Sequence, residues 1–194
     1  MSKKDDILNS AITLFADRGF QDASMTEVAR LAGVSGATVF YHFKSKEALF
    51  LMALETVKDG IIQEFDAYLE HHEFDSGIDL VEGVISFYLY LAGAMEEWFL
   101  LLHSHYPYKL ALVNMECRSH LENVYNSLVD VFERAVALGR KDGSIRALDT
   151  RKTALVIFSM VDGVVRFKIY NLYDTGALFN ELLGSCRKIL KYER

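Results

Sequence analysis

The sequence has little cysteine and almost no proline, and each scarcity narrows the range of folds. Its 2 cysteines, Cys117 and Cys186, are too few and too isolated for a disulfide framework or a metal knuckle. With the single proline at position 107 and mostly scattered glycines, long stretches are free to form helices. Strand-like alternation of apolar and polar residues is hard to find over longer windows. We therefore expect an almost wholly α-helical protein.

Long hydrophobic runs and targeting segments are also missing. No uncharged run exceeds 13 residues, as in residues 83–95, whereas a membrane-spanning helix needs about 20. The N-terminal stretch MSKKDDILNS mixes acids with lysines and has no apolar segment before a cleavage site, so we expect no secretory signal. These features predict a cytoplasmic protein without a membrane partner.

An excess of positive charge, typical of nucleic-acid-binding proteins, is absent from the chain as a whole. The net charge is −6, from 21 basic and 27 acidic residues. Residues 1–50 carry 6 bases and 6 acids, so their sum is zero and the other 144 residues carry all of the −6. A polyanion would be repelled less by this first quarter than by the rest.

What the sequence does contain is a pattern of short helices near its start. Residues 4–18 carry an apolar stripe at helical spacing, and Gly19 follows. Ser24 and Glu27 have the spacing of a capping box, which predicts a second helix that Gly33 ends. Ser35 can cap a third helix over residues 36–43. So short a connection between the second and third helices predicts a helix-turn-helix.

The rest of the chain predicts longer helices. Capping residues and apolar stripes place them at 46 to about 70, 77–92, 94–105 (ended by Pro107), 110–139, 151–173 and 177–191. The expected fold is all-α with about nine helices. Residues 1–47 would form a three-helix DNA-binding domain with a helix-turn-helix, and residues 48–194 a larger helical domain for ligand binding and dimerisation.

The third helix has more exposed aromatic surface than a small helix can leave in water. Val34, Val39 and Phe43 can supply its buried frame. The remaining faces then carry Gly36, Ala37, Thr38, Phe40, Tyr41 and His42. A helix of this kind fits the major groove of B-DNA, where thymine methyls accept apolar contacts and hydroxyls reach phosphates. Lys46, at the start of the next helix, is also suited to phosphate. The alternative is a helix pair buried inside an all-α domain.

The stretch SMTEVARLAGVSGATVFYHFKSKEALF resembles the DNA-binding motif of the tetracycline-repressor (TetR) family of bacterial transcription regulators. The match runs from Ser24 to Leu49, and the helix predicted over 4–18 fits the family's usual first helix. The resemblance implies base contacts by Thr26 and Gly36 and apolar contacts with thymine by Ala37 and Phe40. It implies phosphate contacts by Thr38, Tyr41, His42 and Lys46, with Ser35 beside them.

Two positions depart from the family pattern. Phe40 stands where the family usually has tyrosine, and Gly36 has no side chain with which to read a base. Specificity would then depend more on apolar contacts, on DNA shape, or on N-terminal residues such as Lys3 and Lys4.

The segment TALVIFSMVDGVV, residues 153–165, has one charge and is apolar on more than one side. A helix of that kind must be covered all round, which predicts a partner subunit and hence a homodimer. The alternative is an ordinary central core helix. The candidate interface comprises Leu155, Phe158, Asp162, Val165, Leu178, Leu182, Cys186 and Ile189. The resemblance likewise implies dimerisation through the last two helices.

Residues 87–132 are dense in aromatic side chains interleaved with hydroxyls and imidazoles, a composition typical of pockets for small molecules. Plain core is the alternative for most of them. The candidate ligand-binding residues are Phe87, Tyr88, Trp98, Phe99, His103, Tyr106, Met115 and Tyr125. The resemblance also implies a C-terminal domain that binds a small ligand.

No metal site, cofactor or catalytic motif is expected. His103 and His105 lie on different sides of a helix, and no acidic cluster completes a metal site. No nucleophile elbow, phosphate-binding loop or H-E-x-x-H motif occurs. The sequence therefore predicts a non-enzymatic regulator: a dimeric repressor that binds a palindromic double-stranded operator and is released by a small, largely apolar or aromatic effector. The alternative is a helical ligand-binding or enzymatic protein whose helix-turn-helix is only structural.

Overall fold

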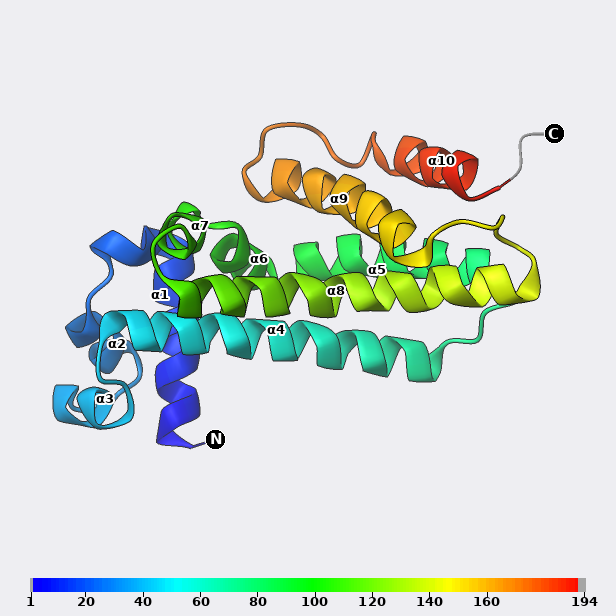
Figure 1. Cartoon of the computed structure of the whole chain (residues 1–194). Helices are drawn as coiled ribbons and strands as arrows, with labels where there is room; N and C mark the ends of the chain where they lie inside the picture. The colour runs from blue at the N-terminus through cyan, green and yellow to red at the C-terminus, as the bar shows by residue number, and fades with distance from the viewer. Residues whose placement is uncertain (1, 192–194) are drawn as a thin grey trace. The chain divides into compact units, whose positions relative to one another are not determined.

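The computed structural model describes residues 2–191, and within that range the regular structure is entirely α-helical (Figure 1). This confirms the predicted fold class. Ten helices occur in the described range, against about nine expected. They are α1 (Lys3–Asp22), α2 (Met25–Leu31), α3 (Gly36–His42), α4 (Lys46–His71), α5 (Gly77–Ala94), α6 (Glu96–His103), α7 (His105–Ala111), α8 (Met115–Asp142), α9 (Thr150–Ile169) and α10 (Phe179–Leu190).

The additional helix arises at Pro107. Its expected role as the residue that ends the preceding helix is wrong: α6 stops at His103, because Ser104 adopts an extended backbone with ψ of 151°. Pro107 lies instead in the first turn of α7, where a missing backbone N–H costs no helical hydrogen bond. The predicted helix over 110–139 is correspondingly divided between α7 and α8.

The chain divides into two compact units. The first comprises residues up to 60 together with 95–124, and the second comprises residues 61–94 together with those from 125 onward. In the first unit, α1 packs against α2, α3 and α6. Its core is formed by fully buried apolar side chains, among them Ile7, Phe15, Val28, Val39, Leu49, Phe50, Leu54 and Phe99.

In the second unit, α5 packs against both α9 and α10. The buried side chains of this core include Val81, Ile85, Tyr88, Leu128, Phe132, Ile157, Val161, Val165 and Cys186. The hydroxyl of Tyr88 donates to Oδ1 of Asp162 at 2.9 Å, and the Tyr88 ring meets Phe158 edge to face at 5.7 Å. At the surface, the Arg187 guanidinium makes two hydrogen bonds to the carboxylate of Glu82, which joins α10 to α5.

The start of α5 is held by the end of α8 and the turn that follows. Gly77 N–H donates to Oδ2 of Asp142 at 2.6 Å, and Ile78 N–H donates to Oγ of Ser144 at 3.1 Å. Hydrogen bonds from Ser144, and then from Gly77, lower the pKa of Asp142. The backbones approach so closely that a Cβ on Gly77 would lie 2.0 Å from the nitrogen of Gly139. Only glycine fits at position 77 without moving α8.

By length and hydropathy alone, α5 is long and apolar enough to cross a membrane; its 18 residues have a mean hydropathy of 1.3. Core helices of water-soluble proteins meet the same criterion. In this fold Ile78, Val81, Val84, Ile85 and Leu91 of α5 are buried inside the protein. Its apolar face is therefore used for packing against α9 and α10.

Candidate nucleic-acid interface

Helix α2 begins at a complete capping box. Oγ of Ser24 accepts a hydrogen bond from Glu27 N–H at 3.2 Å, and Oε2 of Glu27 accepts one from Ser24 N–H at 3.1 Å. Arg18, on α1, donates through Nη1 to Oε1 of Glu27 at 2.6 Å. The hydrogen bond from the Ser24 side chain, assisted by the charge of Arg18, lowers the pKa of Glu27. The ion pair ties α1 to the first turn of α2.

The turn after α2 fixes the direction of α3. Gly33 adopts a φ of +64°, which favours glycine because it lacks a Cβ. Val34 N–H donates to the carbonyl of Ala29 at 3.0 Å, and Gly33 N–H donates to the carbonyl of Arg30 at 3.3 Å. This pair of bonds is a Schellman motif, which satisfies carbonyls at the helix end and turns the chain sharply.

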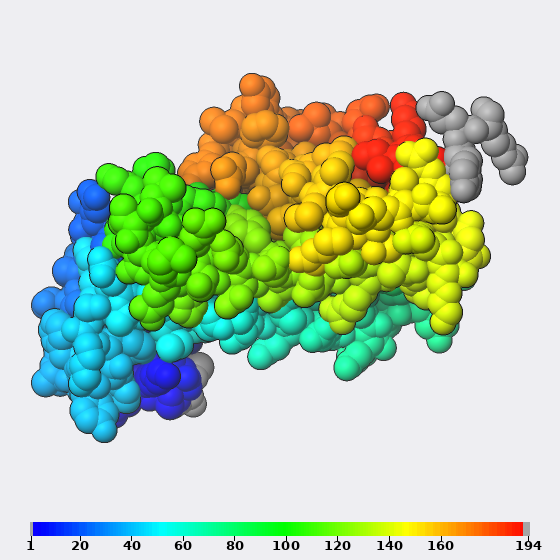
Figure 2. Space-filling model, in the orientation of Figure 1, coloured from blue at the N-terminus to red at the C-terminus, as the bar shows by residue number. Residues whose placement is uncertain are grey.

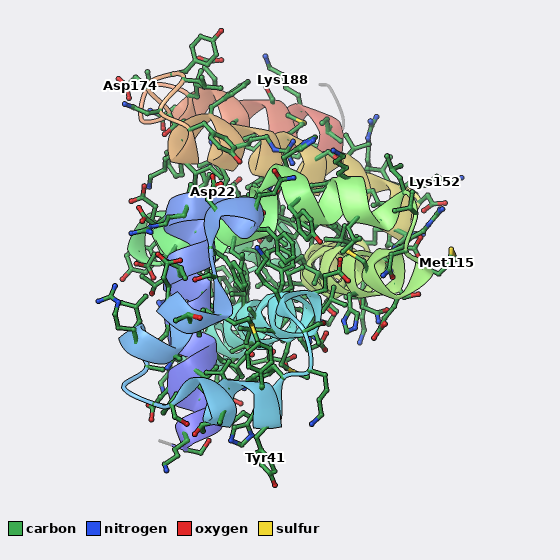
Figure 3. All side chains as sticks on the ribbon, turned by 90° about the vertical axis from the view of Figure 1, so that its left-hand side faces the viewer. Asp22, Tyr41, Met115, Lys152, Asp174 and Lys188 are labelled. Atoms are coloured by element: carbon green, nitrogen blue, oxygen red, sulfur yellow. The ribbon has the colours of Figure 1, made fainter. Side chains whose placement is uncertain are left out.

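Helix α3 is anchored by two buried side chains and leaves its aromatic residues open. Oγ of Ser35 caps it by accepting from Thr38 N–H at 3.1 Å. Val39 and Phe43 are 0% and 4% exposed, whereas Phe40 and Tyr41 are 52% and 74% exposed. Figure 3 shows the Tyr41 side chain pointing away from the ribbon at the end of α3. In the space-filling view the light-blue atoms of this region lie open at the surface of their unit (Figure 2).

The other predicted DNA contacts lie around these aromatics. Thr26, Ser35, Gly36 and Ala37 are exposed, and Thr38 and His42 are half-buried. The hydroxyls of Ser35 and Thr38 lie 2.9 Å apart, so they form one polar patch at the start of α3. Helix α3 thus has an exposed aromatic edge, formed by Phe40 and Tyr41, beside the hydroxyls of Ser35 and Thr38 at its start. The aromatic edge suits apolar contacts in a major groove, and the hydroxyls suit phosphates.

Lys46 does not fit its predicted role as a phosphate contact. Its Nζ donates to the carbonyls of Gln21 and Ala23 at 3.0 and 2.8 Å and lies 4.4 Å from the centre of the Phe20 ring. The reason is local: Gly19, with φ +74°, bends the end of α1 so that these carbonyls point at the start of α4. The Lys46 ammonium therefore joins α1 to α4.

The neighbouring Lys44 is more open to a phosphate than Lys46, and the sequence reasoning did not single it out. Its side chain is exposed directly after α3, and Nζ makes only a long 3.5 Å contact with the Tyr41 carbonyl. The sequence feature that could have pointed to Lys44 is the segment KSK, residues 44–46, in which a lysine stands on each side of Ser45. Oγ of Ser45 accepts a hydrogen bond from Ala48 N–H and so caps the start of α4.

Lys44→Gln and Lys46→Met should therefore have different effects. Lys46→Met removes two bonds from an ammonium to carbonyls, so it should lower the free energy of unfolding by about 1–2 kcal/mol. Lys44→Gln should leave stability unchanged but reduce the slope of log K against log salt for DNA binding by about 2 in a dimer. Denaturant titration and fluorescence anisotropy at several salt concentrations measure both. A smaller salt slope for Lys46→Met with unchanged stability would restore its phosphate role.

The candidate ligand-binding residues fall into both units. Trp98, Phe99, His103, Tyr106 and Met115 belong to the first unit, and Phe87, Tyr88 and Tyr125 belong to the second. Tyr88, Phe99 and His103 are buried, and four others are half-buried. Met115 is 73% exposed and points outward (Figure 3), so it does not fit the prediction of a residue facing an interior cavity.

Half of the candidate dimer-interface residues face the interior of the protomer. Phe158, Val165, Leu182 and Cys186 are at most 6% exposed, which corrects their assignment to a subunit interface. The physical reason is helical phase, since residues 154, 157, 158, 161 and 165 share the face of α9 that packs on α5. Leu155 is exposed, and Asp162, Leu178 and Ile189 are half-buried.

The outer face of α9 carries the apolar surface that the sequence led us to expect. Leu155, Val156, Phe167 and Tyr170 are 44%, 51%, 37% and 45% exposed. A shallow hollow of about 380 Å³ is lined by Leu155, Val156, Ser159 and Met160. Two distinct faces of this helix are thus apolar, and residues 2–191 cover only the one that packs on α5. Among residues 2–191, no group of three or more histidine, cysteine or acidic side chains is placed to hold a metal ion.

Comparison with known proteins agrees with this geometry. Residues 7–53 match the family model described as bacterial regulatory proteins, tetR family. The HTH-type transcriptional regulator YfiR of Bacillus subtilis is 27% identical over 174 residues, covering 87% of this chain and 80% of the relative. Several solved structures share the fold over nearly the whole chain, among them two with a bound ligand.

The first of these structures is the transcriptional regulator FadR from Bacillus subtilis in complex with stearoyl-CoA, which has a TM-score of 0.78 and 20% identity and covers 96% of this chain and 98% of that chain. The second is a transcriptional regulator from Saccharomonospora viridis in complex with choline, with a TM-score of 0.83 and 20% identity, covering 98% of each chain.

Proposed function

Because the chain belongs to the tetR family of bacterial regulatory proteins, a family of helix-turn-helix transcription regulators and not of enzymes, we propose that it is a homodimeric, effector-controlled repressor. It binds a palindromic operator through α3 of each subunit, in the bacterial cytoplasm, and a small effector releases it. Residues 1–47 form the DNA-binding domain and residues 48–194 the ligand-binding and dimerisation domain.

The observation that carries the proposal is the division of α3 into a buried and an open side. Phe40 and Tyr41 are exposed although their burial would be favourable, while Val39 and Phe43 hold the helix in place. Exposed aromatic side chains beside hydroxyls match the contacts that a major groove offers. With Lys44 and the hydroxyls of Ser35 and Thr38 on phosphates, each subunit reads one half-site.

A dimer is favoured by the outer face of α9. Two copies that bury Leu155, Val156, Met160, Phe167 and Tyr170 against each other would remove a row of large apolar side chains from water. A twofold assembly also explains how one short helix achieves sequence specificity, because a second copy repeats its contacts one DNA turn away, about 34–36 Å.

Val156→Arg should convert the dimer into monomers. Val156 is 51% exposed within the protomer, so the substitution leaves the protomer fold intact. In the dimer it would place two unpaired cations in an apolar interface, where each costs several kcal/mol. Light scattering after size-exclusion chromatography should give half the wild-type mass, with unchanged far-ultraviolet circular dichroism. Lys152→Gln, an exposed change on the same helix, is the control, and a dimeric Val156→Arg protein would contradict this interface.

The effector is proposed to be largely apolar or aromatic. The candidates of the second unit, Phe87, Tyr88 and Tyr125, are aromatic, and two of them carry a hydroxyl, a composition typical of sites for such molecules. The ligands in the two similar structures, stearoyl-CoA and choline, are the first compounds to test on this chain.

The test of the proposed function is DNA binding and its release. The full chain should shift a duplex taken from promoter regions, with an affinity that falls steeply as salt rises. An effector that weakens operator binding by a given factor must itself bind more weakly, by the same factor, when the operator is present. No affinity for any duplex at low salt, or an effector constant unchanged by saturating operator, would refute the proposal.

A further inference from the structure

A cleft of about 260 Å³ opens at the end of α1, in the same compact unit as α2 and α3. One side is made by residues 18–21 and the other by α7 with its N-terminal neighbour Ser104, and α7 lies beside the end of α1 (Figure 1). The bend at Gly19 creates the hollow, because it turns residues 20–22 away from the axis of α1. The lining residues are Arg18, Gly19, Phe20, Gln21, Ser104, His105, Tyr106 and Lys109.

The charge of this cleft is opposite to that of the protein. Arg18 and Lys109 line it together with His105, and no carboxylate does, although the chain carries a net charge of −6. Within residues 2–191, neither the Lys109 nor the His105 side chain has a hydrogen-bond or ion-pair partner. Arg18 uses Nη1 for Glu27 and lies 3.6 Å from Asp17 through Nε, so Nη2 remains for a further acceptor. A hollow lined by Lys109, which has no partner among the described residues, and by an Arg18 with a donor to spare favours an anion.

Side-chain contacts connect the walls of the cleft to the starts of α2 and α4. The rings of Phe20 and Tyr106 stack in parallel, with centres 3.5 Å apart. The Tyr106 hydroxyl donates to Oε1 of Glu47 at 3.2 Å, and burial together with the Glu47 charge raises the pKa of Tyr106 to about 12. Lys46 binds the carbonyl of Gln21. At the start of α4, Glu47 therefore binds Tyr106 and Lys46 binds Gln21. At the start of α2, Glu27 binds Arg18 in the same way.

We propose that this cleft binds a small organic anion, with a carboxylate or a phosphate monoester as its charged group, and that the anion competes with Glu27 for Arg18. The volume suits a molecule of modest size, and Lys109 and Arg18 face its charge. Binding would weaken the ion pair between α1 and the capping box of α2. An effect of the anion on operator affinity rests on the proposed function, whereas binding of the anion to the cleft does not. Experiments can therefore refute the anion site and the proposed function separately.

Isothermal titration of the full chain with phenyl phosphate and with benzoate tests the site, with benzamide as the uncharged analogue. At least one anion should bind with a dissociation constant of about 1 mM or below, and benzamide should not. Lys109→Gln should weaken binding about tenfold, because a charge-assisted contact is lost. Lys152→Gln removes one positive charge outside the cleft and should have no effect. A preference for one anion over the other identifies the charged group.

Competition between the anion and Glu27 for Arg18 gives a second test, in which a substitution should strengthen anion binding. Glu27→Gln preserves the capping box, since glutamine can make the same bond to Ser24 N–H, but it removes the charge that holds Arg18. This variant should bind the anion several-fold more tightly, whereas Arg18→Gln should bind it about tenfold more weakly. Absence of binding by either anion, equal binding of benzamide, or constants unchanged by Lys109→Gln and Glu27→Gln would each overturn the proposal.

Discussion

Replacing both Phe40 and Tyr41 by alanine is expected to weaken operator binding about a thousandfold while leaving the fold intact. Both side chains are more than half exposed, so their removal takes little from the core and stability should change by at most about 0.5 kcal/mol. We take about 1 kcal/mol for each side chain at each half-site, the low end of the range for a contact that reads a base, and a dimer has two half-sites. A total near 4 kcal/mol corresponds to a factor of about 10³. Fluorescence anisotropy with a labelled operator measures the loss.

The matched control is Tyr90→Ala on α5. Tyr90 is 66% exposed, so its side chain is as open to solvent as those of α3, but it lies in the second unit. Its removal should leave operator affinity within a factor of two or so of the wild type. An operator affinity that survives the double substitution, or that falls as far in Tyr90→Ala, would show that α3 is not the reading helix.

Gly77→Ala is expected to cause the largest loss of stability. The new Cβ would lie 2.0 Å from the backbone nitrogen of Gly139 and 2.2 Å from its Cα, and backbone atoms cannot rotate away. Helix α5 would have to move off α8, which would also stretch the bonds from Gly77 and Ile78 to Asp142 and Ser144. A loss of about 3 kcal/mol follows from such overpacking. For a chain of this size it should lower Tm by about 6–12 °C in differential scanning calorimetry.

Gly36→Ala provides the comparison for this prediction. A Cβ at position 36 meets nothing within 4 Å, and the residue lies in the first turn of α3. Without DNA, the added methyl should stabilise the protein slightly, by about 0.5 kcal/mol, because alanine loses less backbone entropy than glycine. If Gly77→Ala unfolded at the wild-type temperature, the close approach of α5 to α8 would not exist in solution.

Much of this fold could be predicted from the sequence, because the residues that mark its helix ends act through local hydrogen bonds. Ser24 with Glu27, Gly33 and Ser35 mark helix ends through bonds that span three to five residues, and each of these helix ends lies where the sequence predicted it. The apolar spacing that places Val39 and Phe43 inside also leaves Phe40 and Tyr41 outside. Periodicity therefore predicted which side of α3 is open before any coordinate was known.

The remaining features depend on contacts between residues distant in sequence. Nothing near Lys46 indicates that its ammonium would meet the carbonyls of Gln21 and Ala23, because that contact requires the bend at Gly19. Likewise, α9 is apolar on two sides, and its composition alone does not say which side packs on α5. Phe158 and Val165, predicted for a subunit interface, therefore lie on the buried face, and the exposed Val156 was not among the predicted residues.

The alternation along α3 separates the residues that build the helix from those available to read DNA. Val39 and Phe43 are buried and cannot vary without loss of packing, whereas positions 36, 37, 40 and 41 are exposed. On the proposed function, we expect new operator preferences to arise by exchange at those four positions with little change in stability. A combinatorial library restricted to them is a practical route to retargeting this scaffold.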